Sequence, residues 1–179
     1  MKTVTGLFDD YSDASAAVSA LESAGVPSKD ISIVSNNADN RHADTSNAAE
    51  GAGTGAGIGA AVGGTGGLLT GLGLMAIPGV GPVVAAGWLA ATAVGAVAGA
   101  VAGGATGGII GAMTRSGVSE DDAHVYAEGV RRGGSLVTAK VDDTLVPEAE
   151  AILKRSNWVD PAERRASYNE HGWTRFDDT

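Results

Sequence analysis

The N-terminal part of the chain alternates between the apolar spacing of a strand and that of a helix. Residues 3–8 include three large apolar side chains and predict a short strand. The next apolar residues have the i, i+3, i+4, i+7 spacing of one helix face: Ala14, Ala17, Val18 and Leu21. Gly25 ends this helix and Pro27 prevents its resumption. A second strand follows at 31–34, and the βαβ order predicts a parallel pair with a helical crossover.

The C-terminal part shows the same two patterns in the order helix, strand, helix. Ser119, with Asp122 three residues later, has the form of a capping box at a helix start. The apolar stripe of that helix is Ala123, Tyr126, Ala127 and Val130. Residues 135–141 alternate as a third strand. Pro147 suits the first turn of a last helix, so the order is αβα.

Between these parts lies a segment, 51–114, that has no Asp, Glu, Lys, Arg or His. Glycine recurs in it at four-residue spacing in two series: Gly51, Gly55, Gly59, Gly63, Gly67 and Gly71, then Gly95, Gly99, Gly103, Gly107 and Gly111. On a helix, residues four apart lie on one face, and glycine there lets a second backbone approach closely. The segment is broken by a turn sequence that contains Pro78, Gly79, Gly81 and Pro82. We therefore predict a helical hairpin with arms at 53–77 and 83–113.

The outer parts are too short to fold separately. At about 40 residues each, neither is expected to bury a stable core alone. We therefore predict an α/β (α+β) fold, in which a small βαβ–αβα sandwich is interrupted by the long Gly/Ala-rich helical hairpin. The expected organisation is a split α/β domain (1–35 and 116–159), a polar linker (36–50), the glycine-zipper helical hairpin (51–114) and a polar, partly ordered tail (160–179).

The glycine spacing limits how the predicted hairpin can find partners. Each four-residue step advances about 400° around a helix, so the glycine face shifts by about 40° per step. From Gly51 to Gly71 the face turns through roughly 200°, which one straight partner cannot follow. Either helices cross over two or three glycines, or different stretches meet different neighbours. The second option favours a homo-oligomer in which hairpins pack within and between subunits.

Charge and cysteine usage exclude several classes of function. The formal net charge of −9 argues against nucleic acid, because phosphate binding needs a basic surface. It also argues against attraction to anionic lipid headgroups, so membrane association would depend on apolar burial. The absence of cysteine excludes disulfides and thiol catalysis. Asp9 and Asp10 lie where a signal peptide would need its apolar core, so we expect no signal peptide.

The sequence contains no recognisable catalytic motif. It has no G-x-x-x-x-G-K-[ST], H-E-x-x-H or G-x-S-x-G. Residues 55–60 match a loose G-x-G-x-x-A, as chance predicts in glycine-rich sequence, and no acid that could bind a ribose follows before Glu120. Asp121, Asp122 and His124 could contact a metal, but acids are also typical of a helix start. We predict no catalytic, cofactor-binding or metal-binding residues and no enzymatic activity.

Short motifs near both ends of the chain carry a family resemblance. They are VTGLFD at 4–9, AGVP at 24–27, DISIV at 30–34, VDPAERR at 159–165 and GW at 172–173. Together they resemble bacterial general stress proteins of the heat-induced type, whose members often carry a glycine-rich apolar insertion. The resemblance covers most of the chain. It implies a stress-linked bacterial protein and brings no catalytic residues with it.

The uncharged segment also suggests a membrane location. A transmembrane helix needs ~20 mainly apolar residues. Val83 to Ala102 offers such a span with Trp88 near an interface, whereas 57–77 is poorer because of its glycines. Two spans would place both termini on one side, and Arg41 and Arg115 indicate the cytoplasmic side of the bacterial inner membrane. The alternatives are a cytoplasmic soluble assembly with the hairpin as its apolar core, and a largely disordered segment.

These observations lead to three hypotheses about function. The first is a non-enzymatic, stress-associated protein that self-assembles through the glycine-zipper hairpin in or on the inner membrane. Its partners would be its own copies and the lipid bilayer, with no nucleic acid. The second is a soluble homo-oligomeric scaffold or shell. The third is a regulatory module that binds a small ligand through the α/β domain.

Overall fold

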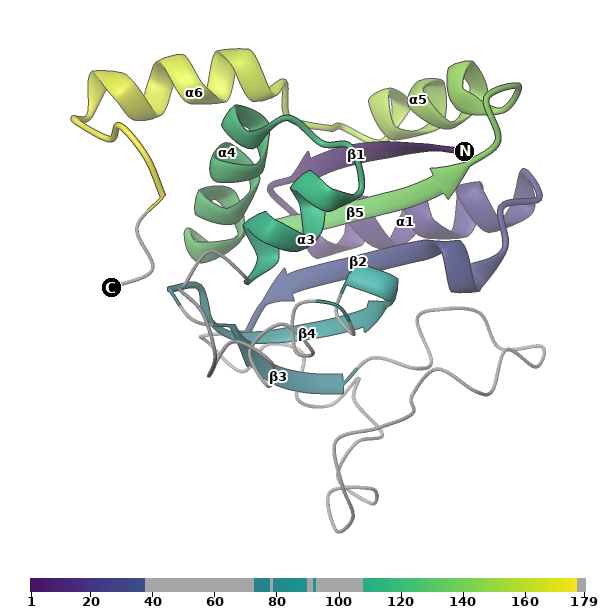
Figure 1. The fold of residues 1–179 in the computed structure, drawn as a ribbon, viewed down its shortest axis with the longest axis horizontal. Helices are drawn as coiled ribbons and strands as arrows, with labels where there is room; N and C mark the ends of the chain where they lie inside the picture. Colours follow the sequence, from purple (N-terminus) through teal and green to yellow (C-terminus); the bar gives the residue numbers. More distant parts are fainter. Residues whose placement is uncertain (38–72, 78, 90–91, 93–107, 177–179) are drawn as a thin grey trace, which may run out of the picture.

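A single five-stranded sheet forms the centre of the fold. A computed structural model describes residues 1–37, 73–77, 79–89, 92 and 108–176. The strands are β1 (Lys2–Phe8), β2 (Ile31–Asn36), β3 (Gly73–Ile77), β4 (Gly81–Gly87) and β5 (Ser135–Val141). Their order across the sheet is β1-β5-β2-β4-β3, and every neighbouring pair is antiparallel (Figure 1).

Helices cover both faces of this sheet. One face carries α1 (Tyr11–Ser23) and α5 (Val146–Arg155). The other carries α3 (Ile109–Arg115) and α4 (Glu120–Arg131), against which α6 (Pro161–Glu170) lies. A short 3-10 helix, η1 (Ser28–Asp30), leads into β2. The predicted α/β class is confirmed, and the described residues form three layers (Figure 1).

The two faces have separate apolar cores. The first core lies beneath α1 and α5 and includes Phe8, and the second lies beneath α3 and α4 and includes Leu7. These consecutive residues enter different cores because side chains alternate across a strand. The four residues predicted to form the inner face of the first helix are fully buried in the first core: Ala14, Ala17, Val18 and Leu21.

The outer halves join in one sheet through β5. The sequence predicts that strands β1 and β2 pair directly, and this is wrong. They run in the same direction, but β5 lies between them and pairs antiparallel with both. Leu136 of β5 is opposite Leu7 on one side and Val34 on the other. The unit is therefore a split βαβ, in which the C-terminal part supplies the missing central strand.

The centre of the chain forms a β-hairpin where helical arms are predicted. Residues 73–77 and 81–87 are strands β3 and β4, so the prediction of helix at these positions is wrong. The chain reverses at 79–80, where Gly79 and Gly81 have positive φ angles of 77° and 97°. Val83 and Val84 are fully buried in β4, between β2 and β3. Their β-branched side chains suit a central strand, whose two faces are both covered.

Most of the glycine series lies outside the described residues. Gly111 is within them and is buried in α3. The remaining ten glycines and Pro78 lie outside, as do residues 53–72 and 93–107 of the arms predicted at 53–77 and 83–113. The membrane span predicted from Val83 to Ala102 begins inside β4, which is a strand. Within the described residues, no helix is long and apolar enough to cross a membrane.

The C-terminal segment folds onto α4. Asp160 caps α6, because its carboxylate accepts hydrogen bonds from the backbone N–H groups of Ala162 at 2.8 Å and Glu163 at 3.2 Å. Further along, Tyr168 and Phe176 are 5 % and 7 % exposed. Residues 160–176, predicted as a partly ordered tail, thus contribute a capped helix and an aromatic residue of the second core.

Candidate interaction groove at the sheet edge

The free side of β1 is the most distinctive surface of the sandwich. β1 is an edge strand that pairs with β5 on one side. On its other side the carbonyl oxygen of Leu7 accepts a hydrogen bond from the backbone N–H of Val159 at 2.7 Å. Backbone groups of alternate strand residues point to opposite sides. The backbone groups of Thr3 and Thr5 therefore share the orientation of Leu7 and point away from β5.

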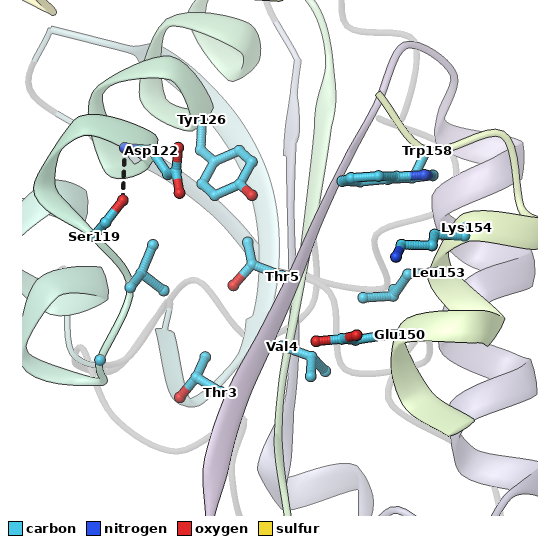
Figure 2. A pocket seen from close by; sticks show the side chains of 12 residues that line it. Thr3, Val4, Thr5, Ser119, Asp122, Tyr126, Glu150, Leu153, Lys154 and Trp158 are labelled. Atoms are coloured by element: carbon cyan, nitrogen blue, oxygen red, sulfur yellow. Dashed lines mark hydrogen bonds between the residues drawn. The ribbon is translucent and has the colours of Figure 1, made fainter. Parts of the chain in front are cut away.

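A groove follows this edge. It has a volume of about 310 Å³ and is bounded on one side by α4 and on the other by α5 (Figure 2). The α4 side is formed by Gly117, Val118, Ser119, Asp122 and Tyr126. The α5 side is formed by Glu150, Leu153, Lys154 and Trp158. Thr3, Val4 and Thr5 form the floor between the two walls.

The α4 wall is fixed by the start of its helix. Ser119 is the N-cap, and its hydroxyl accepts a hydrogen bond from the backbone N–H of Asp122 at 3.1 Å, as the sequence predicts (Figure 2). The side chain of Asp122 binds Arg165 of α6 at 2.7 Å. The wall is thus held both by the helix cap and by an ion pair to the C-terminal segment.

The α5 wall combines apolar and charged groups. Leu153 is buried in the first core, so its position is set by the packing of α5 on the sheet. Glu150 and Lys154 are four residues apart on the exposed face of the helix. The ammonium nitrogen of Lys154 lies 5.7 Å from the ring centre of Trp158. This wall therefore presents an acid, a base and an indole beside the edge strand.

Hydroxyl groups line the floor and one wall of the groove. Burial raises the pKa of Tyr126, and the carboxylates of Asp122 and Asp160 raise it further. The phenol therefore stays protonated and can donate a hydrogen bond. The Oγ1 atom of Thr5 is buried without a hydrogen-bond partner among the described residues, whereas that of Thr3 donates to the carbonyl oxygen of Ser116 at 2.7 Å. One hydroxyl of the floor is thus unpaired and the other is held by the turn before α4.

The structure places the histidines and the candidate metal ligands of the sequence in other contacts. Among the described residues, no three His, Asp or Glu side chains are placed to hold a metal ion. Asp122 and His124, considered as metal ligands from the sequence, instead contact arginines, Arg165 and Arg175. His171 ends α6, with its Nδ1 2.7 Å from the carbonyl oxygen of Ser167. His42 lies outside the described residues.

The groove is not among the site residues predicted from the sequence. The predicted set consists of the spaced glycines and the turn around Gly79, and neither lines the groove. A weak signal exists in β1, where Thr3 and Thr5 place hydroxyls at alternate positions of an otherwise apolar strand. The sequence pattern alone does not reveal that β1 is an edge strand, because the position of β5 depends on long-range pairing.

Comparisons with known proteins identify part of the chain. Residues 3–77 match the family model described as the heat-induced stress protein YflT domain. No curated protein and no solved structure matches the chain. The match spans β1, α1, β2 and β3, while β5 lies beyond it. The resemblance to bacterial general stress proteins is confirmed over these residues, and it supports a stress-associated role.

Proposed function

We propose that this chain is a non-enzymatic, stress-associated protein that assembles with its own copies through two glycine-rich runs, 51–72 and 90–107. The observation that carries the proposal is the way the uncharged segment is anchored. Residues 73–77 and 81–87 complete the sheet, and 109–115 form α3. Each run therefore has a folded anchor, and the described part of the uncharged segment belongs to the sandwich.

The anchors of the second run meet in one core. Leu89, before this run, and Ile109, after it, are both almost completely buried in the second core. Val80 and Val83 of the β-hairpin belong to the same core. The runs between these anchors carry no charged side chain and contain ten of the eleven spaced glycines. Uncharged, apolar sequence on this scale favours burial, and a further copy of the chain offers a matching surface.

The positions of the anchors favour assembly outside the hydrocarbon core of a membrane. A run that leaves the sandwich and returns to it must cross a bilayer twice, at ~20 residues for each crossing. The stretch between Leu89 and Ile109 suffices for one such crossing only. The uncharged residues before Gly73 begin at residue 51 and suffice for one crossing only. We therefore propose a homo-oligomeric scaffold rather than a membrane-embedded assembly.

The four-residue spacing of the glycines supports more than two copies. If the runs pack as helices, the glycine face turns by about 40° with each step, so successive glycines meet different neighbours. Close backbone contact at glycine depends on the absence of a side chain. A bulky residue at a spaced position would then separate the copies, whereas the same residue one position away would be tolerated better.

The decisive experiment measures the mass of the assembly for two matched variants. One variant carries leucine at Gly59, Gly63, Gly99 and Gly103. We expect it to sediment as a much smaller species than the unmodified chain in detergent-free analytical ultracentrifugation. Its matched control carries four leucines one position further along, at Ala60, Gly64, Ala100 and Gly104, and should keep the size of the assembly. Unchanged mass in the first variant would refute assembly through the spaced glycines.

Fractionation of the unmodified chain tests where the assembly forms. After cell lysis without detergent, we expect a discrete particle in the supernatant of a high-speed spin. Recovery only in the membrane pellet, with extraction by detergent but not by carbonate, would contradict the scaffold proposal. That outcome would favour the membrane-embedded form predicted from the sequence.

A further inference from the structure

The open edge of β1 offers backbone groups that a further strand could pair with. We propose that the groove along β1 binds an extended peptide segment of another polypeptide, which adds to the sheet as a strand next to β1. The inference concerns β1, α4 and α5, so it is independent of assembly through the glycine-rich runs. Strand addition of this kind obtains affinity from main-chain hydrogen bonds and selectivity from the walls beside them.

The backbone of β1 supplies the first argument. The N–H and C=O groups of Thr3 and Thr5 point away from β5, and within the described residues no backbone group pairs with them. Both residues line the groove, so these groups are accessible to a ligand. Unpaired backbone groups at an accessible edge are a ready template for strand pairing.

The chain itself shows that this edge accepts another backbone. Val159 forms an antiparallel bridge to Leu7 on the free side of β1. The bridge ends where α6 begins at Pro161, because proline has no N–H to donate and the chain turns into a helix. The edge beyond it, from Thr5 to Thr3, remains open. A peptide of about three to five paired residues would continue the same line of hydrogen bonds.

The walls of the groove define the chemistry of the peptide. Alternate residues of an added strand point toward α4 and toward α5. On the α5 side they meet Leu153 and Trp158, which suit an apolar side chain, and Glu150, which suits a cation. Lys154 is on the same wall, with its ammonium nitrogen 5.7 Å from the ring centre of Trp158. Glu150 is exposed and forms no ion pair with the other described residues. The net charge of −9 also favours approach of a cationic peptide. We therefore assign the groove to an extended segment whose side chains toward α5 include both apolar and basic residues.

A single strand fits this site better than a second sandwich. Helices α4 and α5 flank β1 on both sides of the sheet, and their side chains bound the groove (Figure 2). A second copy would bring its own helical layers along with its edge strand, and these would meet the walls. An extended peptide has no such layers.

The first test uses the full chain and a synthetic peptide, acetyl-Val-Thr-Lys-Thr-Val-Thr-Lys-amide, in which valine and lysine side chains point to the same side of the strand. Binding is followed by the backbone amide NMR signals of Thr3 and Thr5, and we expect both to shift in a saturable way. Two further peptides carry N-methyl groups on either the odd or the even residues. Only one set can face β1, so one of these peptides should lose binding and the other should keep it. Equal effects of both sets, or no saturable shift, would overturn the proposal.

A matched pair of variants tests the protein side. Thr5→Pro removes an outward N–H without breaking a hydrogen bond to β5, and proline is tolerated at such edge positions. We expect it to weaken peptide binding by about tenfold or more, whereas Thr5→Ala, which keeps the N–H, should bind as the unmodified chain does. If Thr5→Pro fails to fold, the N-methyl pair still decides the question. If Thr5→Pro folds and changes the mass of the assembly but not peptide affinity, the edge is a contact between copies and the proposal is wrong.

The charge assignment has its own test. Glu150→Gln should weaken binding of the lysine-containing peptide several-fold at low salt and leave a peptide with threonine in place of lysine unaffected. Equal affinity of the lysine peptide for both proteins would remove the cationic part of the proposal.

Discussion

The two faces of the sheet are built in different ways. The first core is formed mainly by apolar residues of β1, α1, β2, β4, β5 and α5. The second core adds Val80, Ile109 and Phe176, which come from the uncharged segment and the C-terminal segment. One face is thus supported mainly by the two outer halves of the chain, whereas the other also depends on the central segment and the C-terminal tail.

Charged groups mark the second face as well. Glu128 of α4 is 1 % exposed and forms ion pairs with Arg131 and Arg132. The guanidinium of Arg131 lies 5.1 Å from the ring centre of Phe176, and that of Arg132 lies 4.4 Å from the ring centre of Tyr168. The C-terminal aromatics are therefore linked to a buried carboxylate through two arginines. Variants on this face should be coupled to the tail, and variants on the first face should not.

The largest effect is expected for Phe8→Ala on the first face. Phe8 is fully buried, and a Cβ on Gly6 would lie only 3.2 Å from its ring, so the site is closely packed. Loss of the ring should reduce the free energy of unfolding by about 3–5 kcal/mol, measured by urea denaturation. Combined with Phe176→Ala from the other face, the two losses should add to within about 0.5 kcal/mol. Strong non-additivity would contradict the separation of the two cores.

A smaller effect is expected for Glu128→Gln on the second face. The change removes the charge that holds Arg131 and Arg132, and both arginines are partly exposed and can turn to solvent. We expect a loss of about 1.5–3 kcal/mol in the free energy of unfolding. The control is Glu120→Gln. Because the Glu120–Arg175 pair is exposed, its loss should lower the free energy of unfolding by less than about 1 kcal/mol.

The coupling between Glu128 and the tail sharpens the contrast with Phe8. Arg131 contacts both the carboxylate and the ring of Phe176. In a double-mutant cycle of Glu128→Gln and Phe176→Ala, we therefore expect an interaction energy of about 0.5–1 kcal/mol. A value near zero would mean that the tail is held independently of the buried acid.

The elements that the sequence predicts well depend on local pattern. The inner face of α1 has the i, i+3, i+4 spacing that only a helix places on one side, and the cap of α4 needs just Ser119 and Asp122. The helix α6 also has a local signature, Asp160 at the N-cap followed by Pro161, but the few apolar residues after it favour a tail.

The features that the sequence does not reveal depend on distant pairing. Glycine spacing and the absence of charge fit a helical hairpin. They carry no information about β2, the strand with which β4 pairs. The valines at 80, 83 and 84 favour a strand, but the glycine spacing and the lack of charge favour a helix more strongly. The groove exists because β5 inserts between β1 and β2 and leaves β1 at the edge, and this pairing is not visible in the local sequence. Thr3 and Thr5 have no special spacing that would show this.

The smallest effect concerns pH and again separates the two faces. His124 of α4 is buried on the second face, where its Nε2 accepts a hydrogen bond from Nε of Arg175 at 3.0 Å. Burial and the Arg175 charge lower the pKa of His124, while Glu120 and Asp121 oppose the shift. The unfolded chain therefore binds a proton at higher pH than the folded chain does. The contribution of neutral His124 to the free energy of unfolding should be complete above about pH 6.5. It should decrease as the pH drops from there through the pKa of His124 in the folded chain.

Matched histidine variants test this dependence on pH. We expect the free energy of unfolding, measured by urea denaturation at pH 7.5 and pH 5.5, to fall less in His124→Gln than in the unmodified chain. His171 is exposed at the end of α6, so His171→Gln should retain the full pH dependence. All other side chains are the same in the proteins compared, so the difference reports the substituted histidine alone. The same fall in all three proteins would show that the Arg175–His124 contact does not link the tail to proton binding.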